Sequence, residues 1–141
     1  MGLLMSTRNR HFPVMIILAL ILFIASVNLL ADYWHLYYYI WWLDIPMHIL
    51  GGLWIGLTVL SIYYRKSKRG KKDHLPLFVY TLTIATVLFI GIAWEIYEFA
   101  VDRVVAAFGI SLGDSLKDLV DDLLGGVLAA FIFVRRRYNK E

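Results

Sequence analysis

The sequence contains four apolar stretches, each long enough to cross a lipid bilayer as a helix. They are residues 13–31, 45–64, 75–101 and 116–134. A hydrocarbon core of about 30 Å requires roughly 20 helical residues. Because lipid offers the backbone no hydrogen-bond partners, only helices and closed barrels span it, and a barrel would need many short alternating strands. We therefore predict an all-α, polytopic membrane protein with four transmembrane helices in a small bundle, forming one domain over residues 1–141.

Composition agrees with a membrane location and argues against other classes. Of the 141 residues, 60% are hydrophobic, which is a larger share than an ordinary soluble domain of this size carries. The absence of cysteine excludes disulfides and thiolate metal ligands. The net charge of +3 comes from short basic blocks beside the apolar stretches, as membrane topology explains better than nucleic-acid binding does.

The basic residues predict an orientation. Twelve of the fourteen Lys and Arg residues precede the first stretch, lie in the loop at 65–74, or follow the fourth stretch, and only Arg103 and Lys117 lie opposite. The positive-inside rule then makes both termini cytoplasmic in a multi-pass protein of the plasma (inner) membrane. The first stretch is longer than the core of a usual signal peptide and no small-x-small cleavage site follows it, so we expect a retained anchor.

An aromatic segment, "DYWHLYYYIWWLD" at residues 32–44, falls on the outer side in this topology. Tyr and Trp favour the membrane interface, where an apolar ring and a polar edge are both satisfied. We predict an interfacial helix or loop. It serves either as a plain aromatic belt or as a lid and lipid-contact platform over a site.

Acidic residues gather on the outer half, which the positive-inside rule does not require. Helical register at 3.6 residues per turn places them on three stripes, each about 60° wide or narrower. The stripes are Glu95, Glu98 and Asp102; Asp114, Asp118 and Asp121, with Asp122 beside them; and Asp44 with His48. Ionisable groups in membranes face the bundle interior or a water-filled cavity. We therefore predict a polar pocket that opens outward.

Structural roles are open for the same residues. Asp114 or Ser115 can cap the fourth helix, and Ser115 with Asp118 fits a capping box. The acids can also pair with Arg103 and Lys117 to lock helix ends together. Two bases cannot neutralise seven clustered acids, however, so a further cation or bound protons would still be needed. The glycine pairs at 51–52 and 125–126 are expected to allow close helix packing.

A histidine among carboxylates, without cysteine, favours a divalent cation: Mg²⁺, Mn²⁺, Ca²⁺ or Zn²⁺. The candidate ligands are His48, Glu95, Glu98, Asp118, Asp121 and Asp122, with Asp44, Asp102 and Asp114 as secondary candidates. We predict that His48, Glu98, Asp118 and one of the Asp121–Asp122 pair share one cation. His48 or Glu98 would be the catalytic base, while Arg103 and Lys117 would hold a lipid headgroup.

Two classes of function fit such a pocket. One is metal-assisted hydrolysis of a lipid-linked substrate. The other is non-enzymatic: ion or headgroup binding, transport, or a scaffold role in envelope homeostasis or antibiotic resistance. The expected partners are the bilayer and a lipid headgroup, not nucleic acid, and a homo-oligomer is compatible with the sequence. If no metal binds, no other cofactor is expected.

Three segments carry a resemblance to known families: "DIPMHILGG" at 44–52, "WEIYEFAVD" at 94–102, and residues 113–126. In them the chain resembles the YjdF-like inner-membrane proteins, a domain-of-unknown-function family, and more distantly the VanZ-like proteins. The resemblance implies a membrane protein of four to six helices. It also marks a set of residues to test: His48, Glu95, Glu98, Asp118 and Asp122.

Overall fold

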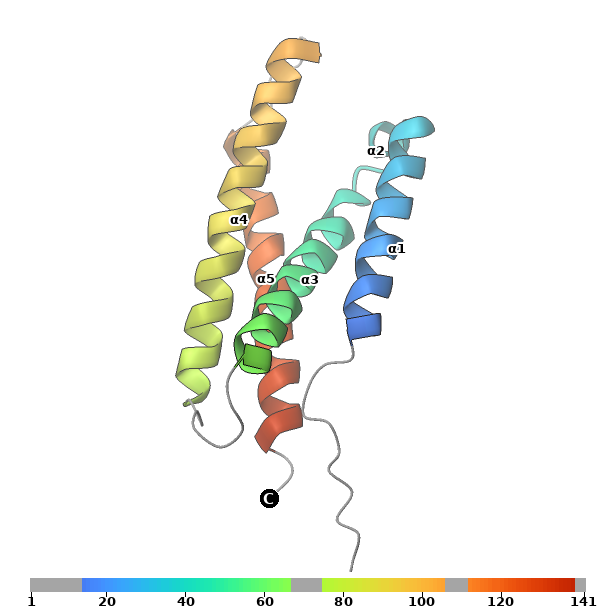
Figure 1. Cartoon of the computed structure of the whole chain (residues 1–141). Coiled ribbons are helices and arrows are strands. Elements are labelled where there is room, and N and C mark those ends of the chain that lie inside the picture. Colours follow the sequence, from blue (N-terminus) through green and yellow to red (C-terminus); the bar gives the residue numbers. More distant parts are fainter. Residues whose placement is uncertain (1–13, 67–74, 106–111, 139–141) are drawn as a thin grey trace, which may run out of the picture.

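The computed structural model describes residues 14–66, 75–105 and 112–138, without the side chains of 65–66, 102–105 and 137–138. Every regular element within these ranges is a helix. In chain order the helices are α1 (Val14–Tyr33), α2 (Leu36–Tyr39), α3 (Asp44–Lys66), α4 (Pro76–Val105) and α5 (Leu112–Tyr138) (Figure 1). The fold is therefore all-α across the described part of the chain.

Three of the described helices are long and apolar enough to cross a membrane: Val14–Tyr33, Asp44–Tyr64 and Pro76–Val101. Three of the four predicted spans are thus supported. The predicted fourth span lies in α5, which carries five charged residues in its first half, at 114, 117, 118, 121 and 122, and further ones from Arg135 onward. Its uncharged run, residues 123–134, would be roughly 18 Å long at 1.5 Å per residue.

Helices α1 and α4 turn large apolar side chains outward. Leu22 on α1 is 67% exposed and Phe89 on α4 is 76% exposed, and many neighbours are exposed as well. A soluble protein rarely presents apolar surface of this extent. Together with their length, these outward faces make α1 and α4 suited to contact with lipid tails.

Helices α3, α4 and α5 pack together, with their most extensive contact between α3 and α5, while α1 packs on α3 (Figure 1). Glycines make the α3–α5 contact close. A Cβ at Gly52 would lie 2.7 Å from the carbonyl carbon of Asp122, and one at Gly125 would lie 2.6 Å from the backbone nitrogen of Leu53. Such separations exclude any side chain. The predicted close packing at both glycine pairs is therefore present in this contact.

The apolar core occupies one end of the bundle. Its buried cluster joins all four long helices through Ile17, Leu57, Leu60, Val79, Ala129, Ala130 and Phe133. Toward the other end, the buried positions of α3, α4 and α5 become polar: His48, Glu95, Asp118, Asp121 and Asp122. The bundle therefore has an apolar half beside the basic flanks and a polar half opposite.

Residues 32–44, predicted as one interfacial segment, divide into the end of α1, the short helix α2 and a turn into α3. His35 adopts the left-handed conformation, with φ 53° and ψ 35°, between α1 and α2. This turn folds α2 back so that the Tyr37 hydroxyl donates a hydrogen bond to Asn28 Oδ1 on α1. Most aromatic rings of the segment are exposed, including Trp41 and Tyr38.

Candidate cation site

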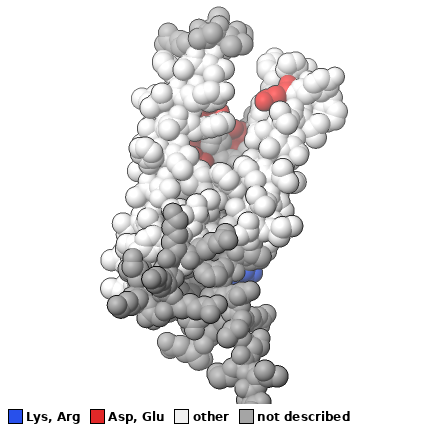
Figure 2. All heavy atoms as spheres, viewed as in Figure 1, with Lys and Arg blue, Asp and Glu red and all other residues white. Residues whose placement is uncertain are grey.

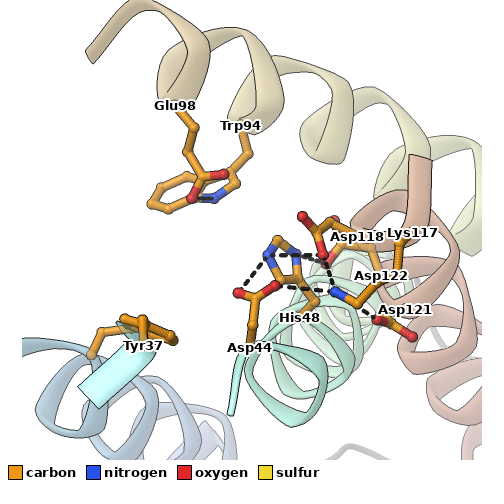
Figure 3. Close-up of polar contacts among 10 residues, drawn as sticks. Tyr37, Asp44, His48, Trp94, Glu98, Lys117, Asp118, Asp121 and Asp122 are labelled. Carbon is orange, nitrogen blue, oxygen red and sulfur yellow. Dashed lines mark hydrogen bonds and ion pairs between the residues drawn. The ribbon is translucent and has the colours of Figure 1, made fainter. Parts of the chain in front are cut away.

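Polar side chains from α3, α4 and α5 converge at the polar half of the bundle. The space-filling view shows acidic side chains inside a hollow between walls that otherwise carry no Lys, Arg, Asp or Glu on the visible face (Figure 2). Figure 3 shows the groups that meet there: Asp44 and His48 on α3, Trp94 and Glu98 on α4, and Lys117, Asp118, Asp121 and Asp122 on α5. We call this group of residues, together with Glu95 of α4, the polar pocket.

His48 lies at the centre of the polar pocket and is buried. Its Nδ1 is 3.3 Å from Asp122 Oδ1, and its Nε2 is 3.4 Å from Asp44 Oδ1 and 4.0 Å from Asp118 Oδ1. In one neutral tautomer, Nδ1–H donates to Asp122 and the Nε2 lone pair stays available. A carboxylate that orients the far nitrogen of a histidine is the usual outer partner of a metal-binding imidazole.

Lys117 is the basic residue that neutralises part of this charge. Its Nζ lies 2.6 Å from Asp118 Oδ1, 3.2 Å from Asp44 Oδ2 and 3.6 Å from Asp121 Oδ2 (Figure 3). The side chain is 40% exposed, so it reaches from the rim of the hollow inward. The predicted headgroup-binding residue is thus engaged with three carboxylates of its own chain.

Among the described residues, no basic side chain pairs with the carboxylate of Glu95. It is only 8% exposed, and neither of its carboxylate oxygens has a hydrogen-bond partner in that part of the chain. Ligand atoms of His48, Glu95 and Glu98 all lie within 4.8 Å of one another. A buried carboxylate without a hydrogen-bond donor is costly, and a cation bound beside it would offset that cost.

Glu98 is held by its neighbour one turn earlier on α4. The indole nitrogen of Trp94 donates a hydrogen bond of 2.8 Å to Glu98 Oε1 (Figure 3). This bond leaves the second carboxylate oxygen available and restricts the rotation of the group. Trp94 was not among the predicted site residues, although its i, i+4 spacing to Glu98 could have indicated the contact.

Glycines on two helices make room for the carboxylate of Asp122. A Cβ at Gly91 on α4 would lie 2.8 Å from Asp122 Oδ2 and 3.0 Å from Leu119 Cδ2. On the other side, Gly51 leaves Asp122 Oδ1 at 3.9 Å from where its Cβ would be. A side chain at Gly91 would therefore displace the buried carboxylate, whereas a Cβ at Gly51 would be in ordinary van der Waals contact with it.

Tyr37 of α2 lies on the α1–α2 side of the same space (Figure 3). Burial, together with the negative charges of Asp44, Asp32 and Glu98, raises the pKa of Tyr37 to about 12. The phenol therefore stays protonated at neutral pH and keeps its hydrogen bond to Asn28. Nothing in its sequence position, within a run of aromatic residues, singled out Tyr37 beforehand.

Five of the predicted site residues form two overlapping sets that both include His48. Their ligand atoms lie within 4.8 Å of one another in each set: His48 with Glu95 and Glu98, and His48 with Asp44 and Asp118. Asp122 contacts His48, and Asp121 contacts Lys117. Asp114 lies exposed in the first turn of α5, in neither set. The side chains of Asp102 and Arg103 lie outside the described residues.

Comparison with known proteins bears on the chain as a whole. A family model described as "Predicted membrane protein (DUF2238)" matches residues 1–139. The chain belongs to this family. Its multi-pass membrane location agrees with the family description and with the three apolar helices. The family description carries neither the YjdF-like nor the VanZ-like name.

One relative from Thermotoga maritima, called "Uncharacterized protein", is 29% identical over 115 residues. The match covers 80% of this chain and 58% of the relative, so the chain spans little more than half the length of that protein. No solved structure matches the chain significantly. The comparisons therefore identify a membrane protein family but no activity, so a function must be argued from the residues of the polar pocket.

Proposed function

We propose that this protein binds one divalent cation in its membrane-embedded polar pocket, through His48, Glu95 and Glu98. The observation that carries the proposal is Glu95, a buried carboxylate without a hydrogen-bond partner among the described residues, within 4.8 Å of two other ligand groups. A cation there would offset the negative charge that Lys117 leaves uncompensated. Asp122 would orient His48, and Trp94 would orient Glu98.

The donor set narrows the choice of cation. One imidazole nitrogen and two carboxylates suit Zn²⁺ or Mn²⁺ better than Mg²⁺ or Ca²⁺, which prefer oxygen ligands alone. Three protein ligands also leave coordination positions for water. Equilibrium dialysis of the purified protein against Mn²⁺ or Zn²⁺, followed by elemental analysis, should find one ion per chain. Absence of binding for both ions would contradict the proposal.

Trp94→Phe tests the support of Glu98. The substitution removes the indole N–H while keeping an aromatic ring at a position that is 50% exposed, so the fold should persist. Loss of an outer partner of a metal ligand typically costs 10–100-fold in affinity. We expect the affinity for Mn²⁺ to fall about 10-fold in equilibrium dialysis. Tyr97→Phe, at an exposed neighbour on α4, serves as the control and should bind like the wild type.

The proposal includes a membrane arrangement. Helix α5 would form a fourth span with its acidic first half buried against α3 and α4. The pocket would open at the outer face of the plasma (inner) membrane, and both termini would be cytoplasmic, as the basic flanks favour. The exposed aromatic rings of residues 32–44 would lie at the outer interface.

Single-cysteine labelling tests this arrangement cleanly, because the native chain has no cysteine. Trp41→Cys, before α3, and Leu112→Cys, at the start of α5, should react with a membrane-impermeant maleimide in intact bacterial cells. Leu75→Cys, beside the basic loop, should react only after the cells are broken. All three positions are more than 70% exposed. Labelling of Leu75→Cys in intact cells would reverse the orientation, and different results for Trp41→Cys and Leu112→Cys would mean that only one of α3 and α4 crosses the membrane.

The second candidate is metal-assisted hydrolysis of a lipid-linked substrate. The hollow that exposes the acids to the surface favours it, because a substrate oxygen could reach a bound cation there (Figure 2). The base would then be Glu98 or His48, whichever of the two does not hold the cation, and the cation would activate water. Release of phosphate from a phospholipid by the Mn²⁺-loaded protein would support this candidate. Stable cation binding without turnover would favour a non-enzymatic role in the cell envelope, within the YjdF-like or VanZ-like setting that the sequence suggests.

A further inference from the structure

The Lys117 ammonium lies among three carboxylates, at a position where a bound cation would be expected if the chain itself supplied no positive charge. Its ammonium nitrogen is 2.6 Å from Asp118 Oδ1, 3.2 Å from Asp44 Oδ2 and 3.6 Å from Asp121 Oδ2. The first two acids belong to the Asp44–His48–Asp118 set, whose ligand atoms lie within 4.8 Å of one another. Asp44 and Asp118 therefore already have a positive charge beside them, while neither Glu95 nor Glu98 has a Lys or Arg partner among the described residues.

Asp121 gives a second indication of a cation position. It is 8% exposed, and its Oδ2 atom is buried without a hydrogen-bond partner among the described residues. At 3.6 Å this oxygen feels the charge of Lys117 Nζ but is too far away to accept a good hydrogen bond. An ammonium has three donors, and a compact ion can attract carboxylates from more directions. Asp121 Oδ2 is thus a buried carboxylate oxygen that lies beside the ammonium without being hydrogen-bonded to it.

We propose that Lys117 occupies a second divalent-cation site and acts as a built-in counter-ion that limits the polar pocket to one metal ion. The inference rests on the proposed function, in which the first ion binds at Glu95 and Glu98. Because both sets include His48, a second ion would lie close to the first, and the two divalent ions would repel each other. Lys117 avoids this repulsion because its ammonium, with a single positive charge, takes the place of the second ion. Without it, Asp44, Asp118 and Asp121 offer three carboxylates, a donor set that suits Mn²⁺ or Mg²⁺.

The test compares Lys117→Met with Lys117→Arg in equilibrium dialysis against Mn²⁺. Methionine keeps the length of the apolar stem but removes the charge, whereas arginine keeps the charge. We expect one ion per chain in the wild type and in Lys117→Arg, and two in Lys117→Met. One ion in Lys117→Met would overturn the inference and leave the proposed function intact. No ion in the wild type with one in Lys117→Met would overturn the proposed function and support the inference.

A thermal measurement covers the case in which Lys117→Met folds poorly. Removing the ammonium leaves three close carboxylates, so the melting temperature of this variant should be low in chelator and should recover in saturating Mn²⁺. The rise should exceed the rise that Mn²⁺ produces in the wild type, because two sites contribute linkage instead of one. A Lys117→Met protein that gains no more from Mn²⁺ than the wild type would contradict the second site.

Discussion

Gly52→Ala is expected to separate α3 from α5 and to abolish the native packing of the polar half. The added Cβ would overlap the carbonyl oxygen of Asp122 and would lie 2.7 Å and 2.9 Å from its carbonyl carbon and Cα. These are backbone atoms, so no side-chain rotation relieves the contact. Helix association in membranes depends on van der Waals packing rather than on the hydrophobic effect, so a displaced backbone loses that packing directly.

The expected magnitude follows from two opposing terms. Alanine improves helix propensity over glycine by up to about 1 kcal/mol. Overpacking that forces backbone shifts typically costs 1–3 kcal/mol, so we expect a net loss of about 2 kcal/mol. The melting temperature of the detergent-solubilised protein should fall by roughly 6 °C. Because Asp122 itself is pushed away, its contact with His48 should be lost as well.

Gly51→Ala is the matched control for Gly52→Ala. Its Cβ would lie 3.9 Å from Asp122 Oδ1, which is ordinary van der Waals contact. This variant should melt at or above the wild-type temperature because it gains helix propensity without a clash. Equal behaviour of the two alanine variants would mean that α3 and α5 do not approach each other as closely as described here.

Glu95→Gln is expected to lower the affinity for Mn²⁺ or Zn²⁺ by more than about 100-fold, because loss of an outer partner alone already costs 10–100-fold. Glutamine keeps the shape of glutamate but removes the negative charge that a cation would neutralise. The same change removes the cost of burying an unpaired carboxylate, so the metal-free variant should be as stable as the wild type or more stable. Equilibrium dialysis and thermal unfolding in chelator measure the two effects.

Asp114→Asn separates a specific effect from a general loss of negative charge. Asp114 lies at the same end of the bundle but is exposed in the first turn of α5 and belongs to neither ligand set. Its amide variant should bind Mn²⁺ with nearly wild-type affinity. If both variants lose affinity equally, the pocket attracts cations only through its overall field, and Glu95 is not a ligand.

Local patterns were sufficient to predict most of the architecture. Apolar stretches of about 20 residues led to the long helices, because the length that spans a bilayer is readable without knowledge of packing. Helical register brought the acids of α4 and α5 onto stripes, since i, i+3 and i, i+4 neighbours share a face. The glycine pairs indicated close contact between helices for the same local reason.

Pairing between helices could not be predicted in the same way. Register places Asp44 and Asp118 on inward faces, but only the crossing of α3 with α5 brings both to Lys117. The sequence left two roles open for Lys117, a contact with a lipid headgroup and an ion pair with the acids, and the packing of the helices shows the ion pairs. Of the four predicted spans, three are supported, and the depth at which α5 can bury its charges likewise depends on the partners that α3 and α4 supply.

The central claim is that His48, Glu95 and Glu98 share one divalent cation. Pulsed electron paramagnetic resonance of the Mn²⁺-loaded protein tests it most directly, since imidazole nitrogen bound to Mn²⁺ gives a resolved hyperfine modulation. We predict this nitrogen signal in the wild type and its loss in His48→Gln. A wild-type spectrum showing Mn²⁺ surrounded by oxygen ligands alone, or only free Mn²⁺, would contradict the proposed site.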